Sequence, residues 1–145
     1  MIENLYEYFK PELDIFLDSV NYNRIESAGN EHNKELSLLC QENIKVSVND
    51  KGVRIIVSRS LLFEPERFFV LNVSLGADLK FNERKNEHKW EDINLAEEFK
   101  ENGAFVTGQL MSRISLLIGQ ITSSFGQAPL IIPAILAKND NNQNN

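Results

Sequence analysis

Cysteine and histidine are almost absent from this chain of 145 residues, which contains one cysteine and two histidines. Cys40 has no second cysteine for an internal disulfide, and no cysteine or histidine spacing near it matches a zinc site. A protein without disulfides suits the reducing cytosol, so we expect a cytoplasmic location. His32 and His88 lie in polar, charged segments, where solvated histidines are expected rather than catalytic or metal-binding ones.

Long apolar runs are also missing. A membrane helix needs roughly 18 consecutive apolar residues, and the best candidate stretch is interrupted by Arg113, Gln120 and several serines and glycines. Glu3 and Glu7 break the N-terminal segment, which lacks the basic start and apolar run of a signal peptide. We therefore expect no membrane insertion.

Basic charge is in the minority, since the net charge is −6 and the isoelectric point is about 5.0. Such a surface repels a phosphate backbone, so we expect no nucleic-acid partner. The glycine-rich nucleotide motifs, the serine nucleophile motif and the zinc-protease motif are all absent. Cys40 is expected to be a small buried side chain, and Glu64 and Glu66 to lie in an exposed turn. The sequence predicts no enzyme, no cofactor and no metal.

Alternating apolar and polar residues dominate the first half of the chain. They predict a strand at residues 14–25 and strand-like structure almost throughout residues 36–82. Within the second stretch, the turn at residues 49–52 predicts a hairpin, and a turn at residues 64–65 leads into a strand at 68–81. Gly76 indicates a bulge or a close approach in that strand.

Several shorter segments complete the predicted order of elements. Residues 1–10 form a short helix or an ordered arm that ends at Pro11, and residues 27–34 form a polar loop. The mixed-charge residues 82–92, which include Trp90, are expected to be a solvated, mobile loop. Residues 95–100 are expected to make one helical turn.

A long helix is predicted at residues 107–125, because apolar residues recur there every three or four positions. So broad an apolar stripe needs neighbours on two sides, the sheet and a second surface. The predicted oligomer interface is Leu110, Met111, Ile114, Leu117, Ile118, Ile121 and Phe125.

Strands first and a long helix last predict an α+β domain, in which helix covers one face of an antiparallel sheet. We expect a single domain at residues 1–137 and a disordered polar tail at residues 138–145. The stretches 61–63, 68–71 and 130–136 contain more large apolar side chains than this small domain can obviously cover. Each residue alone is expected to be core, but the set predicts self-association or a binding groove.

The C-terminal part of the chain carries a recognisable pattern. Residues 112–136 read S-R-I-S-L-L-I-G-Q-I-T-S-S-F-G-Q-A-P-L-I-I-P-A-I-L, a helix with an early arginine followed by a proline-bracketed apolar loop. Upstream lie F-E-P-E-R-F-F-V-L-N-V-S-L at residues 63–75 and N-G-A-F-V-T-G at residues 102–108. Over residues 13–136 this pattern resembles the SecB family of protein-export chaperones and its relatives.

The resemblance implies a four-stranded antiparallel sheet with helices on one face, in dimers that pair into a tetramer. It also implies ATP-independent holding of unfolded proteins by their apolar segments. By position, the helix at residues 107–125 would carry subunit contacts and the loop at 129–136 would line the client groove. The predicted client-binding residues are Phe63, Phe68, Phe69, Leu130, Ile131, Ile132, Ile135 and Leu136.

The chain departs from the family pattern in two places. Family members continue into a second helix after the proline loop, whereas this chain passes into a polar tail, so residues 2–10 are a candidate replacement. Members also dock the export motor SecA through an acidic patch on the sheet, where this chain has Arg54 and Arg59. SecB-like proteins that guard an antitoxin are also known, and the charged residues 82–92 are a candidate contact for such a client.

Three functional hypotheses follow. The first is an ATP-independent holdase that binds non-native polypeptide through apolar grooves. The second is a non-catalytic adaptor or structural subunit that binds one defined protein partner. The third, an enzyme or small-ligand protein, has the least support, because the sequence contains no obvious acid or base set and such a site needs convergent polar groups.

Overall fold

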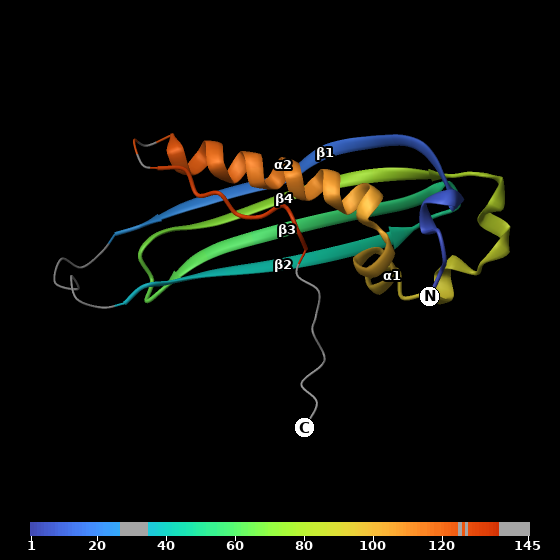
Figure 1. The fold of residues 1–145 in the computed structure, drawn as a ribbon, viewed down its shortest axis with the longest axis horizontal. Coiled ribbons are helices and arrows are strands. Elements are labelled where there is room, and N and C mark those ends of the chain that lie inside the picture. The colour runs from blue at the N-terminus through green and yellow to red at the C-terminus, as the bar shows by residue number, and fades with distance from the viewer. Residues whose placement is uncertain (27–34, 125, 127, 137–145) are drawn as a thin grey trace, which may run out of the picture.

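The computed structural model describes residues 1–26, 35–124, 126 and 128–136, and consists of one sheet with two helices on one face (Figure 1). The four antiparallel strands lie in the order β1-β4-β3-β2, so β1 and β2 are the edges. The strands are β1 (Phe9–Ile25), β2 (Ser37–Val48), β3 (Gly52–Glu64) and β4 (Phe68–Phe81). The helices are α1 (Leu95–Asn102) and α2 (Ala104–Ser123), with short 3-10 helices η1 (Leu5–Tyr8), η2 (Glu83–Glu87) and η3 (Trp90–Asp92). The predicted α+β class and antiparallel sheet are confirmed.

The predicted hairpin joins β2 to β3, with Val48 opposite Val53. Its turn is held by the Asn49 side chain, whose oxygen accepts hydrogen bonds from the backbone nitrogens of Lys51 (2.8 Å) and Gly52 (3.0 Å). Such a side chain supplies a hydrogen-bond partner to backbone groups that a tight turn leaves unpaired. The last predicted strand, β4, also has the expected bounds.

The first strand begins five residues earlier than predicted, at Phe9 rather than at residue 14. Pro11 does not prevent this, because β1 is an edge strand and its pairing with β4 is irregular between Phe9 and Leu13. Proline has no backbone N–H to donate, and an edge strand is where a sheet tolerates this loss. The preceding segment is a single 3-10 turn, Leu5–Tyr8.

Gly76 marks a close approach rather than a bulge. It pairs in regular register with Phe16 on one side and Ile56 on the other. A Cβ atom at this position would lie 2.3 Å from the Phe16 Cζ atom. The glycine therefore makes room for the Phe16 ring, which lies over it on the face of the sheet that the helices leave open. The Arg54 guanidinium is 4.9 Å from the centroid of this ring.

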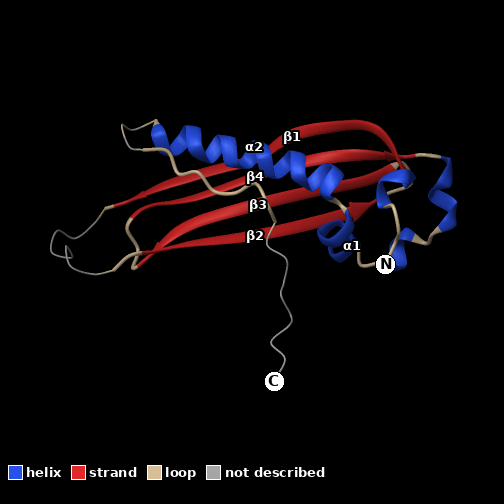
Figure 2. Cartoon of the chain, viewed as in Figure 1, coloured by secondary structure: helices blue, strands red, loops and turns tan. Residues whose placement is uncertain are grey.

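Helix α2 packs on the two central strands and forms the core with them. The buried strand residues alternate, as a sheet covered on one face requires. They are Val53, Ile55, Val57 and Leu61 of β3, and Leu71, Val73, Leu75, Ala77 and Leu79 of β4. The long axis of α2 runs along the sheet, whereas α1 lies near the end of β2 (Figure 2).

The charged segment at residues 82–92 is not the solvated loop that we expected. Trp90 is buried, and its indole nitrogen donates a hydrogen bond to the Lys85 carbonyl at 2.7 Å. Its ring packs against Tyr8, Phe9 and Phe81. The aromatic ring therefore anchors η2 and η3 as a cap over one end of the sheet.

The arginine of this cap forms ion pairs with two carboxylates. Arg84 binds Glu7 and, at 3.1 Å, Glu87, while its guanidinium lies 4.8 Å from the Tyr8 ring centroid. The hydrogen bonds from Arg84 lower the pKa of Glu87. His88, expected to be solvated, lies with its Nε2 atom 2.9 Å from the Tyr8 hydroxyl. Alternating signs in the sequence thus mark pairing across the fold, not mobility.

Replacing Gly52 with alanine is expected to destabilise the protein by about 2 kcal/mol, because overpacking against backbone forces strands apart. The added Cβ would lie 1.8 Å from the Leu79 carbonyl oxygen. In α2, a Cβ on Gly108 would have no atom of the surrounding fold within 4 Å. Gly108→Ala is the control and should stabilise by up to about 1 kcal/mol through helix propensity. Urea unfolding measures both, and equal stabilities for the two variants would contradict the β3–β4 packing.

Candidate functional site

The two arginines that the sequence places on the sheet point to opposite faces. They are five residues apart, and side chains in a strand alternate between faces. On the open face, Arg54 binds Asp78 through two hydrogen bonds of 2.7 and 2.9 Å, which lower the pKa of Asp78. On the helix face, the side chain of Arg59 is only 1% exposed. The expectation of two arginines in one patch is therefore wrong.

Arg59 joins three parts of the molecule beneath α2. Its guanidinium binds Glu42 of β2 at 2.5 Å and donates to the Ser115 hydroxyl of α2 at 3.3 Å. It also donates to the carbonyl of Ile135 at 3.2 Å. A buried arginine needs such partners because an unpaired charge in the interior is costly. The predicted client loop is thus tied to the sheet through this side chain.

Residues 128–136, called here the C-terminal strap, return alongside α2 across the sheet (Figure 1). Besides the bond from Arg59, the Thr122 hydroxyl accepts from the Leu130 nitrogen at 2.9 Å, and the Ser115 hydroxyl donates to the Ile132 carbonyl at 2.8 Å. Leu130, Ile132, Ala134 and Leu136 pack on the core. Ile131 and Ile135 point outward and are 79% and 72% exposed. The strap is thus an extended segment with one apolar side in contact and one in solvent.

The N-terminal segment does not replace the helix that would cover the strap. The Ile2 nitrogen donates to Glu98 of α1 at 3.0 Å, and Tyr6 contacts Phe105 edge to face. These contacts place residues 2–10 at the end of the sheet with α1 and the cap, apart from the strap (Figure 1). The expectation that this segment covers the client loop is wrong.

An aromatic cleft opens at the other end of the sheet, between the end of α2 and the strands beside it. It encloses about 950 Å³. Its walls, defined here as the aromatic cleft, are Tyr22, Arg24, Ile25, Glu26, Phe63, Phe68, Phe69, Thr122, Ala128 and Leu130. The rings contact one another: Phe63 lies edge to face on Phe68 and Phe69, and Tyr22 stacks on Phe69 with centroids 5.4 Å apart. Phe68 is still 52% exposed.

A second cleft, the β2 cleft, lies between strand β2 and the strap and measures about 870 Å³. Its apolar walls are Ile44, Ile132, Pro133, Ile135 and Leu136, and the Arg59–Glu42 ion pair and Lys100 also line it. Cys40 also lines it and is exposed, contrary to our expectation of a buried residue, because it lies on an edge strand. Partial burial raises the pKa of its thiol, which disfavours the reactive thiolate.

The two clefts bring together seven of the eight side chains predicted to bind a client. The aromatic cleft contains Phe63, Phe68, Phe69 and Leu130, and the β2 cleft contains Ile132, Ile135 and Leu136. Ile131 lines neither cleft and lies against Gly119 of α2, where a Cβ atom would be 3.6 Å from its Cδ1 atom. Sequence reasoning missed Tyr22, which comes from the other end of the chain and reaches Phe69 because β1 pairs with β4.

Four of the seven residues predicted to form an oligomer interface are buried within the subunit. Leu110, Met111, Ile114 and Ile118 are at most 1% exposed within the single subunit, so they cannot contact a second one. They instead attach α2 to its own sheet, which explains the apolar spacing by itself. Leu117 and Ile121 are partly buried, and Leu116 beside them is 63% exposed. Phe125 lies outside the described residues, as do His32, the polar loop 27–34 and the tail 138–145.

The described residues contain no cluster of three or more histidine, cysteine or acidic side chains that could hold a metal ion. The carboxylates of Glu64 and Glu66 are exposed, as predicted for a turn. Neither α1 nor α2 is long and apolar enough to cross a membrane. Apolar clefts, rather than a reactive group, are the notable feature of this surface.

The chain has the fold of the SecB-like chaperones. It matches the structure of the Mycobacterium tuberculosis SecB-like chaperone Rv1957, in complex with a ChAD peptide from the Rv1956 HigA1 antitoxin, with a TM-score of 0.68 over 91% of both chains. At 12% identity the likeness concerns the fold. A Streptococcus agalactiae protein of unknown function aligns with a TM-score of 0.41 at 14% identity, over 84% of this chain and 97% of that one. No family model and no curated protein matches the sequence.

Proposed function

We propose that this protein is an ATP-independent chaperone that holds an extended, apolar stretch of a client polypeptide. The observation that carries the proposal is the aromatic cleft, in which Phe63, Phe68 and Phe69 contact one another and Phe68 remains 52% exposed. Exposed apolar area of this kind usually marks an interaction site.

The energetics suit a holdase. Burying one large apolar side chain contributes about 1.5–3 kcal/mol, so two or three client residues in the clefts suffice for binding without ATP. Aromatic walls accept many apolar sequences, because their contacts depend on area more than on particular hydrogen bonds. Strand β2 is an edge beside the second cleft, so an extended client can also pair with its backbone.

A specific client is favoured over a general one. The structural neighbour was solved with a peptide from an antitoxin, which is a single defined partner. Arg24 and Glu26 at the rim of the aromatic cleft offer polar contacts that select among apolar segments. The adaptor hypothesis therefore remains as the second candidate, in which the same clefts bind one native partner. We propose no docking to SecA, since the Arg54–Asp78 pair neutralises the centre of the open face.

Self-association is a further part of the proposal. Leu117 and Ile121 are the part of the predicted interface, within the described residues, that the subunit does not bury fully, and the exposed Leu116 lies beside them on α2. We expect a homo-oligomer in the cytoplasm.

The proposal is tested by adding the purified protein to a chemically unfolded test protein and following light scattering after dilution. A holdase suppresses aggregation at about stoichiometric ratios without ATP. A chaperone for one specific client and a dedicated adaptor both give no suppression but retain one defined protein in a pull-down. The retained protein separates them, because a chaperone client aggregates when it is purified alone and an adaptor partner stays folded. If the protein neither suppresses aggregation nor retains a defined partner, the proposed role has no support.

A further inference from the structure

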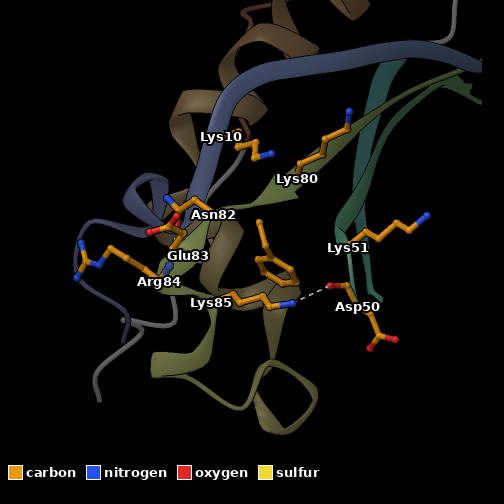
Figure 3. A pocket seen from close by; sticks show the side chains of 9 residues that line it. Lys10, Asp50, Lys51, Lys80, Asn82, Glu83, Arg84 and Lys85 are labelled. Carbon is orange, nitrogen blue, oxygen red and sulfur yellow. Dashed lines mark hydrogen bonds between the residues drawn. The ribbon is translucent and has the colours of Figure 1, made fainter.

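A basic pocket of about 880 Å³ lies at the end of the sheet opposite the aromatic cleft (Figure 3). Four separate segments build it: the start of β1, the β2–β3 turn, the end of β4, and η2. The basic pocket is lined by Lys10, Asp50, Lys51, Lys80, Phe81, Asn82, Glu83, Arg84 and Lys85. Five cations and two carboxylates give this lining a net charge of +3, on a chain whose total charge is −6.

Two of the five cations have structural roles. Arg84 points away from the lysines toward Glu7 and Glu87, as its ion pairs require (Figure 3). Lys85 donates to the main-chain carbonyl of Asp50 at 3.3 Å, which ties η2 to the hairpin turn. The carboxylate of Asp50 lies on the far side of that bond (Figure 3). Lys85 thus keeps its charge at the pocket without a carboxylate partner.

The other three cations, Lys10, Lys51 and Lys80, are exposed and form no ion pair with any described residue. Lys10 and Lys80 come from neighbouring strands and lie together at one side of the pocket (Figure 3). Like charges that line one pocket repel one another, and an anion bound among them relieves that repulsion.

We propose that the basic pocket binds a carboxylate-rich segment of a partner polypeptide. The lysines present separate point charges instead of the bidentate fork of arginine, so they suit several spaced carboxylates. The pocket is open to solvent and its three unpaired lysines are exposed, which favours an extended peptide over a small enclosed ligand. Nucleic acid is disfavoured, because the surrounding protein is acidic and a phosphate backbone extends beyond so small a patch.

This site is separate from the aromatic cleft and does not depend on the proposed function. Along β4, Lys80 lies eleven positions beyond Phe69, roughly 35 Å at the rise of a strand. An acidic segment can therefore bind at one end of the sheet whether or not an apolar segment occupies the other.

Fluorescence anisotropy with a short labelled oligoglutamate peptide tests the proposal at low and high salt. Binding is expected at low salt, and the variant Lys10→Gln/Lys51→Gln/Lys80→Gln should weaken it about tenfold. The matched control Lys45→Gln/Lys89→Gln/Arg113→Gln removes the same charge from exposed positions outside the pocket and should change affinity less than about twofold. Circular dichroism verifies that each variant is folded.

Three results would overturn the proposal. The first is that an oligoglutamine peptide binds as well as oligoglutamate. The second is an equal loss of affinity in both triple variants, which would indicate a diffuse charge effect. The third is that a short single-stranded oligonucleotide displaces the peptide and binds more tightly, which would assign the pocket to nucleic acid.

Discussion

Replacing Phe68 with asparagine is expected to weaken client binding about thirtyfold while the fold remains intact, since an aromatic anchor at the centre of an interface contributes about 2 kcal/mol. The Phe68 side chain is 52% exposed and sits at the mouth of the aromatic cleft. Its backbone has a φ of 60°, in the left-handed region that asparagine tolerates better than phenylalanine. The substitution therefore removes the ring without straining the chain.

Tyr6→Asn is the matched control for this prediction. Tyr6 is similarly exposed, at 55%, and lies at the opposite end of the sheet against Phe105. Titration with an unfolded labelled client should give wild-type affinity for Tyr6→Asn and a large loss for Phe68→Asn. If both variants bind like the wild type, the aromatic cleft is not the client site.

Replacing Arg59 with methionine is expected to destabilise the protein by about 3 kcal/mol, because removing one partner of a buried ion pair leaves the other poorly solvated. Glu42 would lose its arginine, and the carbonyl of Ile135 and the hydroxyl of Ser115 would each lose a donor. Methionine fills a similar volume, so the loss measures the polar contacts rather than a cavity.

Arg54→Met provides the comparison on the other face of the same strand. Its pair with Asp78 is largely exposed, and such pairs contribute less than about 1 kcal/mol. Denaturant unfolding of the two variants therefore separates the buried arginine from the exposed one. Similar losses in both would show that the arginine beneath α2 does not hold the strap to the sheet.

The alternation of apolar residues predicted the strands well, because the side-chain period of a strand is a local property. Val53, Ile55 and Val57 face α2 and Arg54 faces away, as the period of two requires. The same period places Arg54 and Arg59, which are five positions apart, on opposite faces of the sheet. The start of β1 was missed because the effect of Pro11 depends on whether a strand is at an edge, and this depends on the strand order.

The site was predicted in part for a related reason. The client residues fall in two contiguous stretches, so the apolar loop and the Phe-Glu-Pro-Glu-Arg-Phe-Phe segment were visible in the sequence. Tyr22 and Thr122 join them only through the β1–β4 pairing and the return of the strap along α2. Helix periodicity cannot distinguish a subunit interface from a core, which is why Leu110 and Ile114 were assigned to a partner they cannot reach.

The charged segment after β4 was misjudged because composition does not reveal pairing. Its arginine and glutamates cancel in sum, yet Arg84 reaches Glu7 across the fold and Trp90 enters the aromatic cluster of the cap. One tryptophan in a polar segment was the available signal, since a large ring seldom stays in water without a partner.

Hydrogen–deuterium exchange with and without a permanently unfolded client tests the central claim most directly. The account predicts slower exchange around the aromatic cleft, at the ends of β1 and β3 and the start of β4, and along the strap, because the client covers these amides. Exchange in the cap formed by η2 and η3 should change little. Protection confined to the cap, or no protection at Phe63, Phe68 and Phe69, would contradict the assignment of the aromatic cleft as the client site.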